Sequence, residues 1–250
     1  MAARAARTLA GIVLLATTVA GCGGANRQAQ TSARAPAPPT PSFIADGCIP
    51  AGAGTAVKIP ADEHTIPAVV YGHGTRGIVL SNQSDRDLCQ WKAFAPRLAK
   101  AGYQVITWDY GADTPENELA VVASTLRTRG ASELVLIGAS KGAKATLVAA
   151  AGIPAVAGVI SLSGEAVEAD GTVVADHVAK LTAPVLFITA KQDPYGAASA
   201  AKRFMAVSPS KHKRLVTVAG QDHGVDLLTG SHGKRVTGLI TRFLAQQLGG

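Results

Sequence analysis

Three residues of this sequence have the types and the order of a nucleophilic catalytic triad, and the first of them is Ser140. It lies in the stretch GASKG (Gly138–Gly142), between the apolar run ELVLI and the alanine-rich run KATLVAAA. Serine is a poor nucleophile until a base takes its proton, so this turn predicts a histidine and an orienting carboxylate elsewhere. In a chain with 27 glycines, the same pattern can also be a simple connection of small residues without a catalytic role. The elements on either side of the stretch distinguish the two interpretations.

The predicted base is His223 in AGQDHGVD, a glycine-flanked loop after the last predicted strand, and His232 in a similar later loop is the reserve. The predicted acid is Asp193 in FITAKQDPYG, directly after a strand that ends near Ala190. An aspartate before proline is also common as a turn or helix cap. Glu165, which follows SLSG, is the alternative acid. The order serine, acid, histidine is that of a nucleophile-elbow hydrolase.

Acyl transfer also needs two backbone N–H groups to bind the oxyanion. The N–H of Lys141, directly after the serine, is one predicted donor, and that of Gln83 in SNQSDRDLCQW is the other. Trp91 and Tyr195 are candidates to line the site, although aromatic side chains most often pack in the core. Asp109, at the end of YQVITWDY, is expected to be structural.

Short apolar runs alternate with segments of helical period from about residue 55 onward, which predicts an α/β fold. TAVKIPA and TIPAVVYG predict an opening antiparallel pair of strands, and DLCQWKAFAPRLAKAG (Asp87–Gly102) predicts a helix. Near-continuous apolar strands predict a mostly parallel sheet covered on both faces, a three-layer α/β/α sandwich. Too few residues lie between Ser163 and Pro184 for a cap domain, so we expect an open site.

GASKG therefore falls where a parallel strand is followed by a buried helix, as a nucleophile elbow requires. We expect glycine to be needed at Gly138 and Gly142 because the residues two before and two after the serine crowd it. The helix that begins after Ser140 would direct the positive end of its dipole at the serine and at the oxyanion.

The pattern of the N-terminal 42 residues indicates export and tethering to a membrane, so we do not expect them to be part of the fold. Arg4 and Arg7 precede the apolar run Thr8–Ala20, which is shorter than the roughly 20 residues that span a bilayer. The following VAGC resembles the lipobox of bacterial lipoproteins, with Cys22 as the lipidation site, while a cleaved signal peptide with a chance cysteine is the alternative. We predict a signal peptide (1–21), a flexible tether (22–42) and one domain (43–250).

Export to an oxidising compartment favours a disulfide between the two remaining cysteines, Cys48 and Cys89, over two buried thiols. The chain carries 24 Lys+Arg against 17 Asp+Glu, and the excess is spread out, which argues against nucleic-acid binding. No cysteine or histidine spacing suggests a metal, and no cofactor is predicted. We expect a monomer, extracytoplasmic and held at the cell envelope by the lipid on Cys22.

Residues from about 66 to 247 resemble the α/β-hydrolase superfamily, in particular small lidless members akin to dienelactone hydrolases and simple esterases. The similar stretches are LVLIGASKGA, PVLFITAKQDPY and VAGQDHGVDLL. Dienelactone hydrolases use a cysteine nucleophile, so Ser140 does not imply lactone cleavage. Ser81–Asn82 also departs from the His-Gly that many relatives carry there.

The resemblance implies a serine hydrolase that cleaves small-molecule carboxylic esters with short or exposed acyl groups. A peptidase or amidase of the prolyl-oligopeptidase kind has the same triad order and is one alternative. A non-catalytic envelope protein that keeps the fold for binding is the other. A triad with all three members present favours the enzyme.

We expect Cys22→Ser to move the protein out of the membrane fraction, because only the cysteine thiol can accept the diacylglyceryl group. Fractionation with and without detergent, together with the size of the precursor, measures this. Unchanged maturation and fractionation in the variant would leave the N-terminal segment as an ordinary signal peptide.

Overall fold

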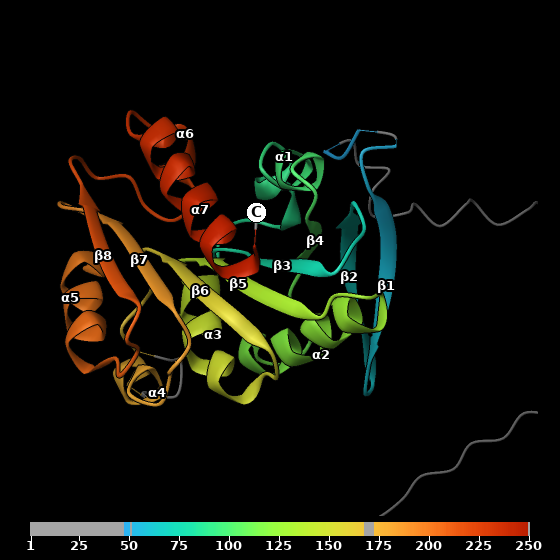
Figure 1. Ribbon diagram of the computed structural model, residues 1–250, viewed down its shortest axis with the longest axis horizontal. Helices are drawn as coiled ribbons and strands as arrows, with labels where there is room; N and C mark the ends of the chain where they lie inside the picture. The colour runs from blue at the N-terminus through green and yellow to red at the C-terminus, as the bar shows by residue number, and fades with distance from the viewer. Residues whose placement is uncertain (1–47, 51, 168–172, 250) are drawn as a thin grey trace, which may run out of the picture. The chain divides into compact units, whose positions relative to one another are not determined.

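An eight-stranded sheet runs through the residues that the computed structural model describes, 48–50, 52–167 and 173–249 (Figure 1). Its strand order is β1-β2-β4-β3-β5-β6-β7-β8. Strand β2 is antiparallel to both of its neighbours, and all other pairs are parallel, which confirms the predicted sheet and its opening antiparallel pair. The strands are β1 (Thr55–Ala61), β2 (His64–Tyr71), β3 (Arg76–Ser81), β4 (Gln104–Trp108), β5 (Glu133–Ala139), β6 (Val156–Leu162), β7 (Val185–Ala190) and β8 (Lys213–Val218).

Helices cover both faces of this sheet, as the three-layer prediction requires. Helices α1 and α7 lie on one face and α2, α3, α4 and α5 on the other (Figure 1). The helices are η1 (Leu88–Trp91), α1 (Ala95–Lys100), α2 (Pro115–Thr128), α3 (Lys141–Ala149), η2 (Ala150–Gly152), α4 (Val174–Val178), α5 (Ala197–Val207), α6 (Asp226–Thr229) and α7 (Gly233–Leu248). Between β6 and β7, the described residues form only the short α4 and an isolated β-bridge, in agreement with the absence of a cap domain.

The sheet divides the core into two hydrophobic clusters, one on each face. Strand β5 shows the division, because Val135 and Ile137 belong to one cluster and Leu134 and Leu136 to the other. Successive strand residues point to opposite faces, so a strand between two helical layers must be apolar at every position. This explains why the central strands read as continuous apolar runs rather than as an alternating pattern.

The segment Asp87–Gly102 does not form the single helix that its apolar spacing predicts. It divides into the 3-10 helix η1 and the α-helix α1. Pro96 lies in the first turn of α1, and its ring nitrogen has no hydrogen to donate to the preceding turn, so the helix begins anew there. The predicted apolar face is nevertheless buried, with Leu88, Trp91, Ala95 and Leu98 all in the core.

A disulfide joins Cys48 to Cys89, with 5.7 Å between the two Cα atoms, which confirms the predicted pairing. Cys89 lies in η1, just after the loop that follows β3, so the bond fixes the chain beside that loop. Disulfides are typical of extracytoplasmic proteins. Across the three described ranges, no helix is both long and apolar enough to cross a bilayer. The predicted lipidation site Cys22, the signal peptide and the tether lie outside the described residues.

We expect the double substitution Cys48→Ser and Cys89→Ser to lower the free energy of unfolding by about 4 kcal/mol. The bond closes a loop with a sequence separation of 41, and the chain-entropy account gives a loss of that size. Urea unfolding under non-reducing conditions measures it, with the unsubstituted protein in the same detergent as the control. Equal stability of the double variant and the control would show that the bond contributes nothing to stability.

Candidate active site

Ser140 occupies a strained turn between β5 and α3. Its backbone has φ 51° and ψ −114°, a conformation that residues with a side chain rarely adopt. The Ser140 N–H donates to the Leu162 carbonyl at the end of β6, 2.8 Å away, and the residue is almost fully buried. Strained backbone of this kind costs about 1–3 kcal/mol and occurs mostly at functional sites. The turn therefore has the geometry of a nucleophile elbow.

Glycine is required on both sides of this turn, as predicted, but the crowding comes from backbone rather than from the serine. A Cβ on Gly138 would lie 2.1 Å from the Gly142 carbonyl oxygen. A Cβ on Gly142 would lie 2.4 Å from the Ser81 carbonyl oxygen and 2.6 Å from that of Asn82. The first turn of α3 therefore packs directly on the end of β3, with no space for a side chain between them.

The structure brings His223 and Asp193 together, from the loops after β8 and β7. His223 Nδ1 lies 2.8 Å from Asp193 Oδ2, and the Tyr195 N–H donates to Asp193 Oδ1 at 3.0 Å. Burial acts to raise the pKa of Asp193, but hydrogen bonds to the carboxylate, first that of His223, outweigh it and lower the pKa. An ionised partner at Nδ1 places the proton of the neutral ring there and leaves Nε2 as the basic nitrogen. The reserve candidate His232 lies instead at the start of α7.

Ser140 contacts Glu165, the alternative acid, rather than a histidine. Its Oγ donates a hydrogen bond to Glu165 Oε1, at 3.1 Å. The nearly buried ammonium of Lys144, one turn along α3, lies 3.8 Å from Glu165 Oε2 and 3.9 Å from Glu116 Oε1. Glu165 is thus held against Ser140, whereas Asp193 holds the imidazole of His223. The sequence pointed to Glu165 as a possible acid but gave no sign of this contact.

Ser140 and His223 line the same cavity, of about 360 Å³, at the carboxyl ends of the parallel strands. Tyr195, one of the predicted lining aromatics, is 75% exposed there, and its ring lies 4.5 Å from that of His223. Trp91, the other, is fully buried and donates from Nε1 to Asn82 Oδ1, so it packs in the core as aromatic side chains most often do. The cavity is lined by Gln83, Ser84, Asp85, Arg86, Ser140, Glu165, Tyr195, His223 and Asp226.

The two predicted oxyanion donors differ in their surroundings. Lys141 is the first residue of α3, so its N–H belongs to the helix terminus, where amides lack a partner within the helix. The Gln83 N–H is directed at the side-chain amide of Gln90. The Gln83 side chain ties the loop after β3 to the histidine loop, because its Oε1 accepts from the Val225 N–H at 3.1 Å. No pattern in the sequence predicted this contact.

Tyr110 and Asp109, which follow β4, support the loop after β3. The Tyr110 hydroxyl donates to the Asn82 carbonyl, which belongs to the same peptide unit as the Gln83 N–H. Asp109 Oδ1 accepts from the Leu88 N–H at 2.6 Å and from the Asn82 side chain at 3.2 Å, in agreement with its predicted structural role. A planar peptide held at its carbonyl also has its N–H direction fixed.

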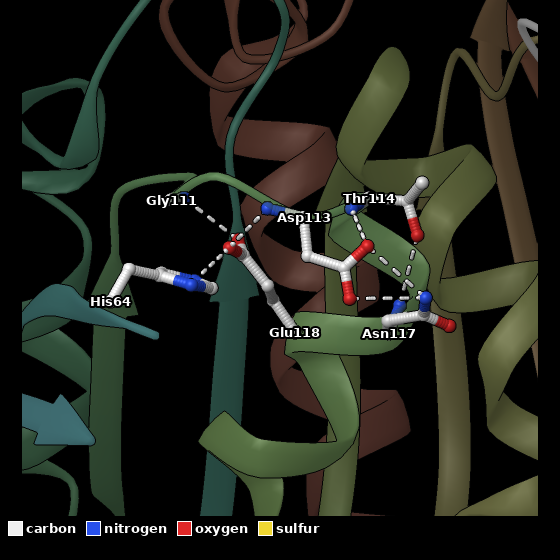
Figure 2. Close-up of polar contacts among 6 residues, drawn as sticks. All are labelled: His64, Gly111, Asp113, Thr114, Asn117 and Glu118. Carbon is white, nitrogen blue, oxygen red and sulfur yellow. Dashed lines mark hydrogen bonds and ion pairs between the residues drawn. The ribbon is translucent and has the colours of Figure 1, made fainter. Parts of the chain in front are cut away.

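A buried carboxylate holds the loop that carries Tyr110. Glu118 of α2 accepts hydrogen bonds from the Gly111 N–H at 2.8 Å and the Asp113 N–H at 3.2 Å, and it lies 2.8 Å from His64 Nε2 (Figure 2). Its side chain is 1% exposed, so these partners replace the water that the charge has lost. Glu118 and His64 thus hold the loop at Gly111 and Asp113, and this loop positions Tyr110.

Solved structures share this fold. A dienelactone hydrolase from Anabaena variabilis superposes with a TM-score of 0.66 at 18% identity, over 78% of this chain and 97% of that one. An esterase from Pyrococcus furiosus gives 0.66 at 13% identity, over 78% and 91%. A monoacylglycerol lipase from Paleococcus ferrophilus gives 0.64 at 14%, over 73% and 99%. No protein-family model and no curated protein sequence matches the chain. The chain has the α/β-hydrolase fold.

We expect Gly142→Ala to lower the free energy of unfolding by about 3 kcal/mol, because the added methyl meets the carbonyls at the end of β3. Gly152→Ala is the matched control, since a Cβ there meets nothing within 4 Å. It should change stability by less than about 0.5 kcal/mol. Urea unfolding compares the two variants, and equal values would contradict the close approach.

Proposed function

We propose that the chain is a serine hydrolase that cleaves carboxylic esters through an acyl-enzyme. The observation that carries this proposal is that His223, paired with Asp193, lines the same cavity as a serine on a strained strand-to-helix turn. The likeness of the fold to dienelactone hydrolases, esterases and a lipase supports the same reaction class. The cavity is open to solvent, which suits short or exposed acyl groups.

The reaction begins when Ser140 Oγ turns about χ1 from Glu165 toward Nε2 of His223, which accepts its proton. The Oγ attacks the ester carbonyl, and the N–H of Lys141 with the positive end of the α3 dipole stabilises the oxyanion. The N–H of Gln83 joins them once the side chain of Gln90 moves away. The imidazolium then donates its proton to the departing alcohol, while Asp193 holds the ring. Water activated by the same imidazole hydrolyses the acyl-enzyme.

The setting of this activity is also a proposal. A lipid on Cys22 would hold the monomeric domain at the cell envelope, and the disulfide fits an extracytoplasmic location. The substrate would then be a small-molecule ester that reaches the outer side of the membrane.

We expect a fluorophosphonate probe to label the folded protein on the Gly138–Gly142 peptide, and to fail on Ser140→Ala and His223→Ala. The probe reacts only with an activated serine beside oxyanion donors, so it needs no knowledge of the substrate. Asp193→Asn should keep the fold and reduce ester hydrolysis by roughly 10⁴, because the imidazole loses the partner that sets its tautomer. Ser199→Ala, an exposed serine on α5, is the matched control and should label normally.

Three outcomes would redirect the proposal. Folded protein that is not labelled would favour the non-catalytic binding protein. Aminoacyl anilides cleaved faster than p-nitrophenyl esters would favour the amidase. Labelling that survives Ser140→Ala would show that GASKG is only a structural joint.

A further inference from the structure

Glu165 contacts the nucleophile but is not needed by the triad. Its Oε1 accepts the hydrogen bond from Ser140 Oγ, while Asp193 already orients His223. The Glu165 side chain is 35% exposed and forms part of the cavity wall. A carboxylate at this position lies within reach of whatever is attached to the serine oxygen during the reaction.

The cations near Glu165 are shared with other groups. Lys144 lies almost equally far from Glu116 and Glu165, at 3.9 and 3.8 Å. The ammonium of Lys141 lies over the ring of Tyr110, 4.9 Å from its centroid. Burial raises the pKa of the Tyr110 hydroxyl, and the negative charges of Glu116 and then Glu165 raise it further. The surroundings of Glu165 can therefore accept a further positive charge.

The lining of the cavity is also predominantly negatively charged. It includes three carboxylates, of Asp85, Glu165 and Asp226, against one guanidinium. That guanidinium, of Arg86, lies 3.2 Å from Asp226 and 4.0 Å from Asp85, so it is already paired at the side of the cavity formed by those residues. Glu165 is the carboxylate of this lining that touches the nucleophile.

Glu165 loses its hydrogen-bond donor when Ser140 turns to His223. A bound substrate covers this carboxylate and excludes the water that would replace the hydroxyl, so a substrate that supplies a donor there is favoured over one that does not. A donor that carries a positive charge forms the stronger bond, roughly twice as strong as a neutral one.

The tetrahedral intermediate indicates which part of the substrate meets Glu165. Its central carbon carries Ser140 Oγ, the oxyanion, the leaving oxygen and the α-carbon of the acyl group. The carboxylate repels the oxyanion, which turns to the amides at the start of α3, and the leaving oxygen must face His223 to receive a proton. The α-carbon is therefore the substituent that faces Glu165.

We propose that the preferred substrates are α-aminoacyl esters, whose ammonium group on the α-carbon replaces the Ser140 hydroxyl as the donor to Glu165. This inference rests on the serine-hydrolase function proposed above. Water adds across the acyl–oxygen bond, so that the amino acid takes the hydroxyl and the alcohol takes the proton. Glu165 is then a specificity-determining residue.

The test compares the p-nitrophenyl esters of alanine and of isobutyric acid at pH 6.5. The two acyl groups have the same shape, and a methyl group in one replaces the ammonium of the other. The ratio of kcat/KM values is divided by the ratio of the uncatalysed hydroxide rates, which removes the intrinsic reactivity of the alanyl ester. We expect a corrected preference of about tenfold or more for the alanyl ester in the unsubstituted protein.

Glu165→Gln should reduce this corrected preference to near unity while isobutyryl hydrolysis changes only a few-fold. Asp226→Asn is the comparison, because it removes a carboxylate of the same cavity that pairs with Arg86, and it should keep most of the preference. An equal loss in both variants would overturn the assignment to Glu165. A parallel loss of activity toward both esters in Glu165→Gln would show a role in the chemistry and would also overturn it.

The unsubstituted protein tests the inference even if Glu165→Gln does not fold. Equal corrected rates for the two esters, in protein that the fluorophosphonate labels, would overturn the substrate class and leave the hydrolase function standing. Absence of both labelling and ester cleavage would overturn the hydrolase function itself, so the two failures are distinguishable.

Discussion

The close approach of α3 to the end of β3 is the constraint on which the rest of the site depends. Gly142 touches the carbonyls of Ser81 and Asn82, and Gly138 touches the carbonyl of Gly142, so the chain must reverse within one tight turn. Ser140 has the left-handed φ that this turn imposes. The strain is offset by the apolar packing of β5 and α3 in the centre of the molecule. The serine is thereby fixed at the end of the sheet where the functional loops meet.

Parallel strands bring the remaining groups to the same edge of the sheet. The loops after β7 and β8 supply Asp193 and His223, because the carboxyl ends of parallel strands lie side by side. The loop after β3 is held from three directions, by the Gln83 side chain, by the Tyr110 hydroxyl and by the disulfide at Cys89. This loop, which carries the second predicted oxyanion donor, is thus well braced, although the N–H of Gln83 is directed at Gln90.

Electrostatics distinguishes the two carboxylates of the candidate site, Asp193 and Glu165. Asp193 is buried and receives hydrogen bonds from His223 and from the backbone, so it serves to orient the ring. Glu165 is half-buried, faces the cavity and shares the cation of Lys144 with Glu116. A carboxylate so placed is within reach of a molecule that binds at the serine. The environment therefore gives two chemically similar side chains different parts in one site.

The sequence by itself determined the sheet, the order of the triad candidates and the position of Ser140, because apolar period and glycine spacing are local properties of the chain. It also favoured the Cys48–Cys89 pairing, since the prediction that Cys22 is lipidated leaves two cysteines, which allow only one bond. The spacing of Leu88 and Leu98 did not show the break at Pro96, because both halves bury the same face. Only the tertiary structure decided that Ser140 contacts Glu165, that Trp91 is core and that Glu118 supports the Tyr110 loop. These contacts join residues distant in the chain, and no local pattern records which loops meet.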